Sequence, residues 1–265
     1  MQEIISPKNS KIKYLLQLQK KSNTRKEFKE FVIEGKREIK AAIENNYKIK
    51  SLFFYPNLFS EKEVFELVKN LEPKVELIKI SEHVYKKIAY RNSTEGIIAV
   101  AQMKQHSLTE LKLSQNPLLL VGEAIEKPGN LGAILRTVDG VNADGLILVD
   151  SKVDIYNPNV IRASLGMVFS RQIVLTNTVE LNNYLRKNNI KLFAATLQNK
   201  HVYYKEDYSN PTAIAVGAED KGLSPEFRKI ADQSVYIPML GHADSLNVSV
   251  AAAVLLYEAL KQRLN

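Results

Sequence analysis

Three segments in the second half of the sequence place glycine, asparagine, serine and charged residues directly after short apolar runs. They are EKPGNLGAILRTVD (126–139), AVGAEDKGLSPE (215–226) and IPMLGHADSLNVS (237–249). Short, unbroken apolar runs are typical of buried parallel strands. Ligands of open parallel sheets bind where the strands end. These three segments are therefore the candidates for a binding or catalytic site.

The polar side chains in these segments also have structural interpretations. Asn130 is placed to cap the helix that follows it, and a lone arginine such as Arg136 on an otherwise apolar helix is usually a surface residue. Ser245, Asn247 and Ser249 stand at the head of a strongly apolar helix. A single cap needs only one of them, so their alternation favours a polar ligand at the helix head.

The second segment has two glycines, Gly217 and Gly222, at the spacing of a phosphate-binding P-loop. That loop requires a lysine directly after the second glycine, followed by serine or threonine. Here Lys221 precedes Gly222 and Leu223 follows it, so we expect no ATP or GTP site. The sequence also lacks a Gly-x-Gly-x-x-Gly fingerprint, which disfavours a nucleotide-dependent dehydrogenase.

The composition excludes several classes of protein. The 265 residues include no cysteine, which excludes disulfides, thiolate zinc sites and cysteine nucleophiles. The four histidines are widely scattered, so we expect no metal. The N-terminus lacks the apolar core of a secretory signal, and the longest apolar run, Leu246 to Leu260, is too short and too polar to span a bilayer. We therefore expect a soluble, cytoplasmic protein without membrane association.

The net charge of +8 is concentrated near the N-terminus. Residues 1–50 contain thirteen Lys and Arg against six Asp and Glu, whereas the rest of the chain is nearly neutral. A basic segment ahead of near-neutral domains is typical of a surface that binds a polyanion, most simply nucleic acid. A solvated, lysine-rich helix face would explain the same charge equally well.

Alternating strand and helix patterns predict two α/β domains that position these segments. In the first domain, the expected strands are FVIEG, LFFY, VELIKI and GIIAVAQ. A polar stretch then ends at Pro117, and the alternation restarts with LLLVGEAI, GLILVD, RQIVLT, KLFAAT, AIAVG and SVYIPM. We predict a small α/β domain over 1–105, a linker over 106–116 and a parallel-sheet α/β domain over 117–265.

In this order and spacing, the three segments resemble the motifs of the SpoU (TrmH-type) RNA ribose 2′-O-methyltransferases, within the SPOUT superfamily of knotted methyltransferases. The first motif of that family, Pro-x-Asn-x-Gly with an arginine six residues after the asparagine, is matched by 128–136. Its second motif, Gly-x-Glu-x-x-Gly-Leu-Ser, is matched by 217–224. Its third, Ile-Pro-Met-x-Gly followed by Ser-Leu-Asn-Val-Ser, is matched by 237–249. The first domain is similar to the ribosomal-protein-like substrate-binding domain often fused to this family.

The resemblance implies S-adenosylmethionine as methyl donor, RNA as substrate, a C-terminal trefoil knot and a homodimer with the active site near the subunit interface. The residues that it assigns to the cofactor are Leu197, Gly217, Gly222, Ile237, Met239 and Leu246. Those that it places around the reacting hydroxyl are Asn130, Arg136, Glu219, Ser245 and Asn247. The RNA contacts expected in the basic N-terminal segment are Lys11, Arg25, Lys36 and Arg37.

Arg136 is often cast as the base in this family, but a guanidinium, with a pKa above about 12, stays protonated at working pH. We therefore expect an electrostatic role, in which Arg136 pairs with a substrate phosphate and the forming oxyanion. Among these residues, Glu219 is the conventional candidate for a base.

The ribosomal-protein-like first domain favours ribosomal RNA as the substrate, with the large subunit preferred. Transfer RNA is the alternative substrate. A non-catalytic RNA-binding module of the same fold is the alternative function, although the intact set of polar residues argues against it.

Overall fold

A computed structural model describes residues 1–90, 95–197 and 201–264 of the chain. The chain divides into two compact units. The first comprises Met1–Lys104 and Asp154–Ser170, and the second comprises Gln105–Val153 and Arg171–Asn265. Within the described ranges, the helices are too short or too polar to cross a membrane.

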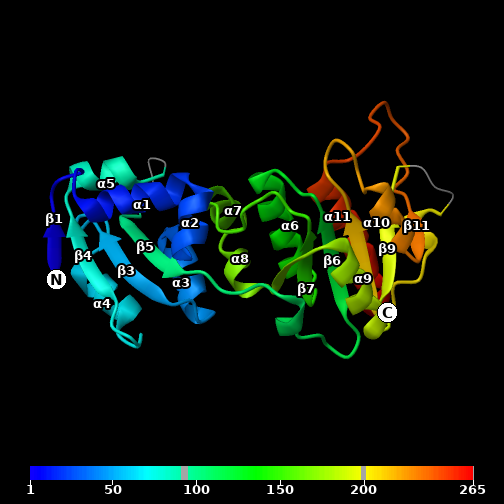
Figure 1. Cartoon of the computed structure of the whole chain (residues 1–265), viewed down its shortest axis with the longest axis horizontal. Coiled ribbons are helices and arrows are strands. Elements are labelled where there is room, and N and C mark those ends of the chain that lie inside the picture. Colours follow the sequence, from blue (N-terminus) through cyan, green and yellow to red (C-terminus); the bar gives the residue numbers. More distant parts are fainter. Residues whose placement is uncertain (91–94, 198–200, 265) are drawn as a thin grey trace. The chain divides into compact units, whose positions relative to one another are not determined.

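The first unit is built on a five-stranded mixed sheet in the order β1-β4-β3-β5-β2, and Figure 1 labels β1, β4, β3 and β5 of this sheet. Its strands are β1 (Gln2–Ile4), β2 (Glu30–Glu34), β3 (Ile49–Phe54), β4 (Glu76–Ile80) and β5 (Ile97–Gln102). Its first five helices are α1 (Ser10–Lys20), α2 (Ser22–Phe28), α3 (Lys36–Glu44), α4 (Glu61–Val68) and α5 (Glu82–Ile88). β5 is antiparallel to β2 and β3, whereas β4 is parallel to β1 and β3.

Helix α1 shows how the sequence builds this unit. Asn9 caps the helix by accepting a hydrogen bond from the Lys11 amide at 2.9 Å. Ile12, Leu15 and Leu18 recur at helical spacing and are fully buried against the sheet. The basic residues between them face outward, so α1 is amphipathic, and Lys21 alone separates it from α2.

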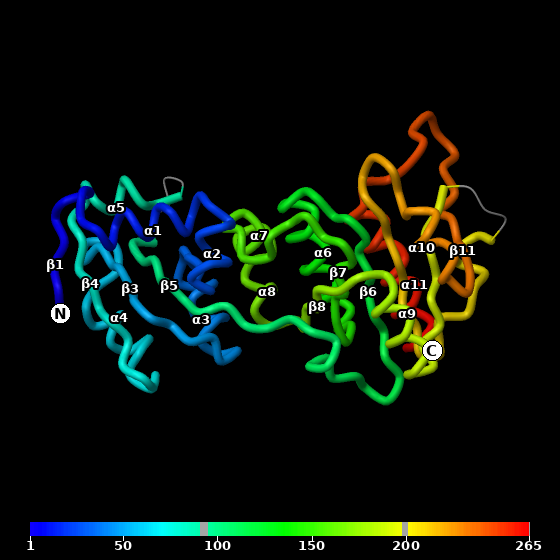
Figure 2. Tube along the Cα trace, viewed as in Figure 1, coloured from blue at the N-terminus to red at the C-terminus, as the bar shows by residue number. Residues whose placement is uncertain are grey.

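A later stretch of the chain completes the first unit. After Val153 the chain forms α7 (Pro158–Ala163) and α8 (Met167–Ser170), then returns to the second unit (Figure 2). Tyr156 and Phe169 from this stretch pack on Phe31 of β2, with ring centroids 4.2 and 5.9 Å apart. Phe169 also lies 5.0 Å from the Tyr47 ring. The aromatic core of the first unit therefore includes residues 154–170, which the sequence analysis assigned to the second domain.

Arg25 joins α2 to this later stretch from inside the first unit. Its guanidinium is 2% exposed and donates to Asp154 at 2.7 Å and to the carbonyl of Leu18 at 2.5 Å. Ser22 donates to the same carboxylate at 2.9 Å. A buried arginine is stable only when its donors are satisfied in this way. Arg25 is committed to structure, which speaks against the RNA contact expected of it.

The second unit contains a six-stranded parallel sheet in the order β11-β9-β10-β6-β7-β8. Its strands are β6 (Leu118–Glu123), β7 (Gly145–Val149), β8 (Ile173–Thr176), β9 (Lys191–Ala195), β10 (Thr212–Val216) and β11 (Gln233–Val235). Its α-helices are α6 (Pro128–Gly140), α9 (Thr178–Lys187), α10 (Pro225–Ile230) and α11 (Val248–Leu264). Short 3-10 turns lie at Leu108–Glu110 and Tyr203–Lys205.

Both faces of this sheet are covered, which explains why its strands are apolar throughout. All residues of β6, β7 and β10 are buried. On one face, Val121 and Ala215 pack with Leu181 of α9 and Phe227 of α10. On the other, α11 packs on α6 and on β10. The predicted parallel-sheet α/β fold, preceded by a smaller α/β unit, is confirmed. The trefoil knot stays a prediction.

Replacing Arg25 with alanine should destabilise the first unit strongly. The change leaves the Asp154 carboxylate and two backbone carbonyls without their buried donor, which costs about 3–5 kcal/mol of unfolding free energy. Denaturant titration measures this loss. Lys20→Ala, an exposed change nearby, should shift stability by less than about 0.5 kcal/mol. Equal stability of the two variants would show that the buried ion pair contributes nothing.

Candidate functional site

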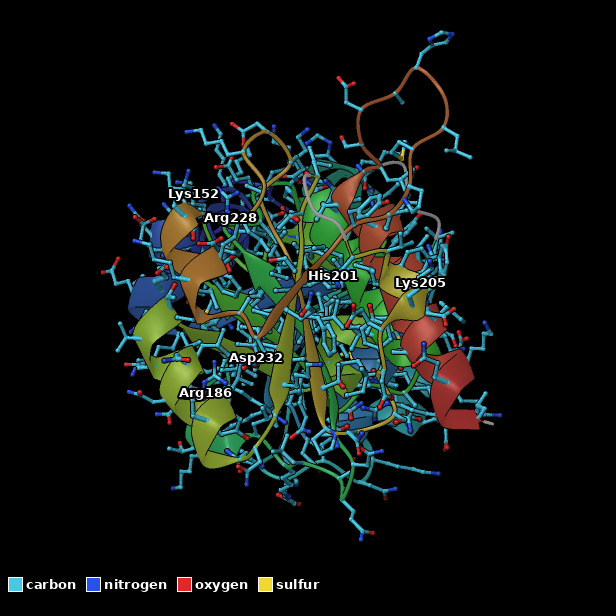
Figure 3. All side chains as sticks on the ribbon, turned by 90° about the vertical axis from the view of Figure 1, so that its right-hand side faces the viewer. Lys152, Arg186, His201, Lys205, Arg228 and Asp232 are labelled. Atoms are coloured by element: carbon cyan, nitrogen blue, oxygen red, sulfur yellow. The ribbon has the colours of Figure 1, made fainter. Side chains whose placement is uncertain are left out.

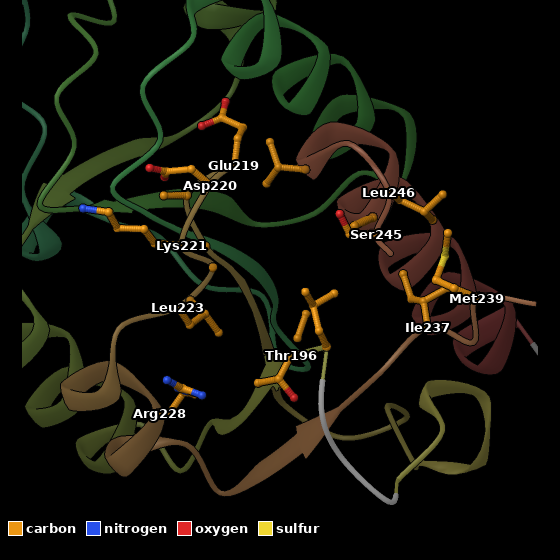
Figure 4. Close-up of a pocket in the computed structure, with 17 residues that line it drawn as sticks. Thr196, Glu219, Asp220, Lys221, Leu223, Arg228, Ile237, Met239, Ser245 and Leu246 are labelled. Atoms are coloured by element: carbon orange, nitrogen blue, oxygen red, sulfur yellow. The ribbon is translucent and has the colours of Figure 1, made fainter. Parts of the chain in front are cut away.

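The carboxyl ends of three neighbouring strands surround a pocket in the second unit. Residues that follow β9, β10 and β11 line it, together with the start of α11. In the close-up of Figure 4, the loop bearing Glu219, Asp220 and Lys221 forms one wall, and Ser245 and Leu246 lie on the other. The cavity has a volume of about 380 Å³. This is within the range of about 300–1,000 Å³ for small-molecule sites.

All of the residues assigned to the cofactor by the resemblance line this pocket: Leu197, Gly217, Gly222, Ile237, Met239 and Leu246. Most of these contribute apolar side chains, whereas the two glycines expose backbone. The lining also includes the charged residues Glu219, Asp220, Lys221 and Arg228, and this mixture of apolar and charged groups suits an adenosine joined to a sulfonium amino acid. The pocket therefore fits S-adenosylmethionine in size and chemistry.

The loop between β10 and α10 is closed at its neck by two glycines. A Cβ atom on Gly217 would lie 2.1 Å from the carbonyl carbon of Gly222, a contact that real Cβ atoms do not make. Gly222 has a φ of +65°, and its amide donates to the carbonyl of Ala218 at 2.9 Å. Only glycine fits the first position, because any side chain would force the two limbs apart.

A chain of hydrogen bonds joins the three sequence segments. Asn130, near the start of α6, donates through its side-chain amide to a carboxylate oxygen of Glu219. Its amide oxygen accepts from the side-chain amide of Asn247 at 3.2 Å. The Asn247 oxygen in turn accepts from the amide and hydroxyl of Ser249, at 2.9 and 2.7 Å. Each partner fixes the direction of the next side-chain amide.

The other two residues assigned to the reacting hydroxyl occupy different positions. Ser245 lines the pocket and is exposed. Arg136 is exposed on α6, six residues after Asn130. At 100° per residue, six residues turn the helix by about 240°. Arg136 and Asn130 therefore project from different faces of α6. Within a single protomer, Arg136 does not join the hydrogen bonds that link Glu219, Asn130 and Asn247.

Sequence reasoning missed Glu123, the last residue of β6. Its side chain is only 6% exposed and accepts two hydrogen bonds from Ser224, at 2.7 Å from the amide and 2.6 Å from the hydroxyl. Ser224 caps α10. The available signal was a charged residue that ends a strand whose other residues are apolar or glycine. Thr196 and Arg228 of the pocket wall were also missed.

Two charged pairs link segments of the second unit. Arg186 of α9 pairs with Asp232, just after α10, and donates to the carbonyl of Ile230 at 2.9 Å (Figure 3). Near the first segment, Lys152 pairs with Glu126 at 2.6 Å. This hydrogen bond raises the pKa of Lys152, and the charge of Asp220 adds a smaller contribution. Within the described ranges, no group of three or more acidic or histidine side chains is arranged to hold a metal.

The remaining candidate RNA contacts lie on the first unit. Lys11 pairs with Glu76 and is partly exposed. Lys36 and Arg37 begin α3 and are exposed, with Lys36 3.5 Å from Glu63. Both line a hollow of about 690 Å³ together with Lys40. Basic side chains thus gather on the first turns of α3, whereas Lys11 is separate from this group.

Comparisons with known proteins agree with the motifs. The SpoU rRNA methylase family matches residues 117–257, and the MRM3-like substrate binding domain matches residues 9–99. The 23S rRNA (guanosine(2553)-2′-O)-methyltransferase RlmP of Bacillus subtilis (strain 168) is 29% identical, with 97% of this chain and 98% of the relative covered. The 23S rRNA (uridine(2479)-2′-O)-methyltransferase of Streptomyces viridochromogenes is 28% identical, with coverage of 98% and 93%.

A solved structure is similar over its whole length. The AdoMet-bound rRNA methyltransferase from Sinorhizobium meliloti superimposes with a TM-score of 0.91 at 27% identity, with 100% of this chain and 99% of that chain covered. The SpoU family match covers more than half of the chain and contains all three segments around the pocket. The chain therefore belongs to the SpoU rRNA methylase family, as the resemblance of its motifs predicts.

Proposed function

We propose that this protein transfers a methyl group from S-adenosylmethionine to a ribose 2′-hydroxyl of large-subunit ribosomal RNA. The observation that carries the proposal is the hydrogen-bonded chain from Glu219 through Asn130 to Asn247. It brings together polar residues from three distant segments, next to a pocket that fits the cofactor. The relatives named above act on 23S rRNA 2′-hydroxyls, which supports the same reaction here.

The residues around the pocket have separate tasks in this reaction. S-adenosylmethionine supplies an electrophilic methyl group when bound. The apolar walls at Leu197, Ile237, Met239 and Leu246 hold the donor, and the narrow neck at Gly217 shapes one side of its pocket. Reaction then requires the hydroxyl to lie in line with the methyl group, and rigid neighbours provide that alignment.

The side chains of the hydrogen-bonded chain form the surface that the substrate contacts. Glu219 has one amide donor from Asn130 and is placed to accept the proton of the ribose hydroxyl or to orient it. Asn247 and Ser245 hold the other side of the same opening. Arg136 contributes positive charge for a phosphate and for the forming oxyanion. A non-catalytic module would not need this set intact.

We propose a homodimer, because one chain leaves the site incomplete. Arg136 points away from the side of α6 that carries Asn130, so it is positioned to serve a neighbouring copy. The adjoining helix α11 exposes Val250 and Tyr257, 47% and 52%, on one face. The Tyr257 hydroxyl lies beside Gly140 of α6. An apolar stripe next to an exposed arginine suits a second copy of the chain.

The first unit supplies the RNA contacts in this proposal. Lys36, Arg37 and Lys40 offer cationic contacts around one hollow that Glu44, Glu63 and Glu95 also line, and Lys11 lies elsewhere on the unit. Phosphate contacts of this kind position RNA without reading its sequence. The relatives modify guanosine in one case and uridine in the other at nearly equal identity, so overall similarity assigns no nucleotide. Ribosomal RNA as the substrate favours a cytoplasmic location.

Arg136→Lys tests the reaction and the role of this arginine together. Wild-type protein should methylate large-subunit rRNA from a strain that lacks the protein, and the variant should be roughly one hundredfold slower or more, because a point charge does not replace a planar fork of donors. S-adenosylmethionine affinity, measured by calorimetry, should stay close to wild type.

Arg186→Lys is the matched control for this experiment, because Arg186 lies on α9 and pairs with Asp232, so the change leaves α6 untouched. It should keep its activity. Methylation of transfer RNA instead of ribosomal RNA would overturn the substrate, and near-native turnover of Arg136→Lys would show that charge alone suffices.

The double change Lys36→Gln and Lys40→Gln should weaken RNA binding and reduce its salt dependence by about 1 to 2 in slope, since each lost phosphate contact releases one counterion fewer. Arg37 is left in place because it covers the buried carboxylate of Glu38. Lys20→Gln with Lys21→Gln removes the same charge from exposed residues on α1 and after it. If both pairs reduce affinity equally, only net charge matters.

Val250→Glu should convert the dimer to a monomer at micromolar concentration, because it places a charge in an apolar interface. Sedimentation velocity measures the change, and methyl transfer should fall with it. Val179→Glu makes the same substitution at a residue of α9 that is 71% exposed, and it should alter neither mass nor rate. A wild-type protein that sediments as a monomer would refute the homodimer directly.

A further inference from the structure

Glu123 is a buried carboxylate outside the set of residues that surround the pocket. It ends β6 and is 6% exposed. Such a group is stable in the interior only when its oxygens accept hydrogen bonds. Both oxygens are satisfied by a single residue, Ser224, which lies 101 positions later in the chain.

Ser224 connects Glu123 to the loop that forms one wall of the pocket. The loop that forms one wall of the pocket leaves β10 at Gly217 and returns at Ser224, where α10 begins. Val216 pairs with Gly122 in the parallel ladder, so Glu123 stands at the base of this loop. Its carboxylate therefore holds the returning limb onto β6, while the glycine neck holds the two limbs together.

The tip of the same loop reaches the other side of the site. Glu219 accepts from Asn130, and Asn130 lies seven residues after Glu123 on the segment that leaves β6. The loop is thus fixed at its tip, at its neck and at its base. Of these three attachments, only the one at the base involves no residue that lines the pocket or belongs to the hydrogen-bonded chain.

We infer that Glu123 is a positioning residue for the cofactor, acting through Ser224 to hold the wall formed by 217–223 in its binding geometry. The inference rests on the proposed function, because it takes S-adenosylmethionine as the ligand of this pocket. Glu123 does not touch the pocket, so its effect on the ligand passes through the loop.

Glu123→Gln is the sharpest variant, because it keeps the shape of the side chain. The amide oxygen still accepts from the Ser224 amide, but the NH2 group now faces a hydroxyl that already accepts from the Phe227 amide at 3.0 Å. The hydroxyl proton loses its acceptor. One lost hydrogen bond to a charged group corresponds to roughly a tenfold change in an equilibrium constant, so the dissociation constant of S-adenosylmethionine should rise by about that factor.

Asp144→Asn is the matched control. Asp144 also accepts hydrogen bonds from two backbone amides, those of Ser114 and Leu118, but Leu118 begins β6 at the opposite end from Glu123. Both variants should lower the melting temperature, and only Glu123→Gln should weaken cofactor binding in calorimetry. Equal weakening by both variants, or wild-type affinity in Glu123→Gln, would overturn the inference.

Ser224→Ala supplies a second, independent measurement. If Glu123 acts through Ser224, the double variant should bind the cofactor no more weakly than the weaker single variant, because the two changes remove the same contact. Additive losses would show that Glu123 acts elsewhere. If wild-type protein does not bind S-adenosylmethionine, the proposed function is refuted. This outcome is distinct from wild-type affinity in Glu123→Gln, which refutes only the role of Glu123.

Discussion

The parallel alignment of β6 with β10 is the constraint on which the site depends. Because these strands run in the same direction and in register, with Val216 opposite Gly122, the segments that follow them leave the sheet at the same edge. One segment carries Asn130 and the other carries Glu219, 89 positions apart in the chain. Neighbouring β9 and β11 add Thr196 and Ile237 at the same edge. A sheet that must be buried on both faces leaves its strand ends as the place where polar groups can meet a ligand.

Within this frame, the site combines two kinds of surface. The pocket wall uses backbone and apolar side chains, and its shape depends on glycine at position 217, where the two limbs of the loop nearly touch. The adjoining opening is polar, and its side-chain amides are oriented by one another. The pocket wall suits binding of the cofactor, and the polar opening suits the group that reacts with it.

The sequence predicted the second unit well because its signals are local. Unbroken apolar runs marked the strands, and the resemblance of the three motifs to a known family pointed to the cofactor residues that line the pocket, but not to Thr196 and Arg228. Other features depend on partners that are distant in the chain. The sequence around Arg25 does not distinguish it from other basic residues, because its partner Asp154 lies 129 positions later. The role of Glu123 likewise depends on Ser224. The charge pattern of a sequence shows that such residues are present, but it does not show that they are buried and paired.

A motif also does not show which face of a helix each of its residues occupies, as Asn130 and Arg136 illustrate. A spacing of six residues is conspicuous in the sequence, but on a helix it separates two side chains instead of grouping them. A short motif can therefore describe residues that lie on different faces of one helix.

The aromatic packing of Phe31 and Tyr47 on Tyr156 and Phe169 has a consequence for synthesis of the chain. The first hundred residues leave the ribosome before the residues that complete their core, and between them come β6, α6 and β7 of the other unit. Nascent domains generally fold as units in order of synthesis. Here the N-terminal domain cannot finish folding until about 170 residues have emerged, so its maturation is tied in time to the first strands of the methyltransferase sheet.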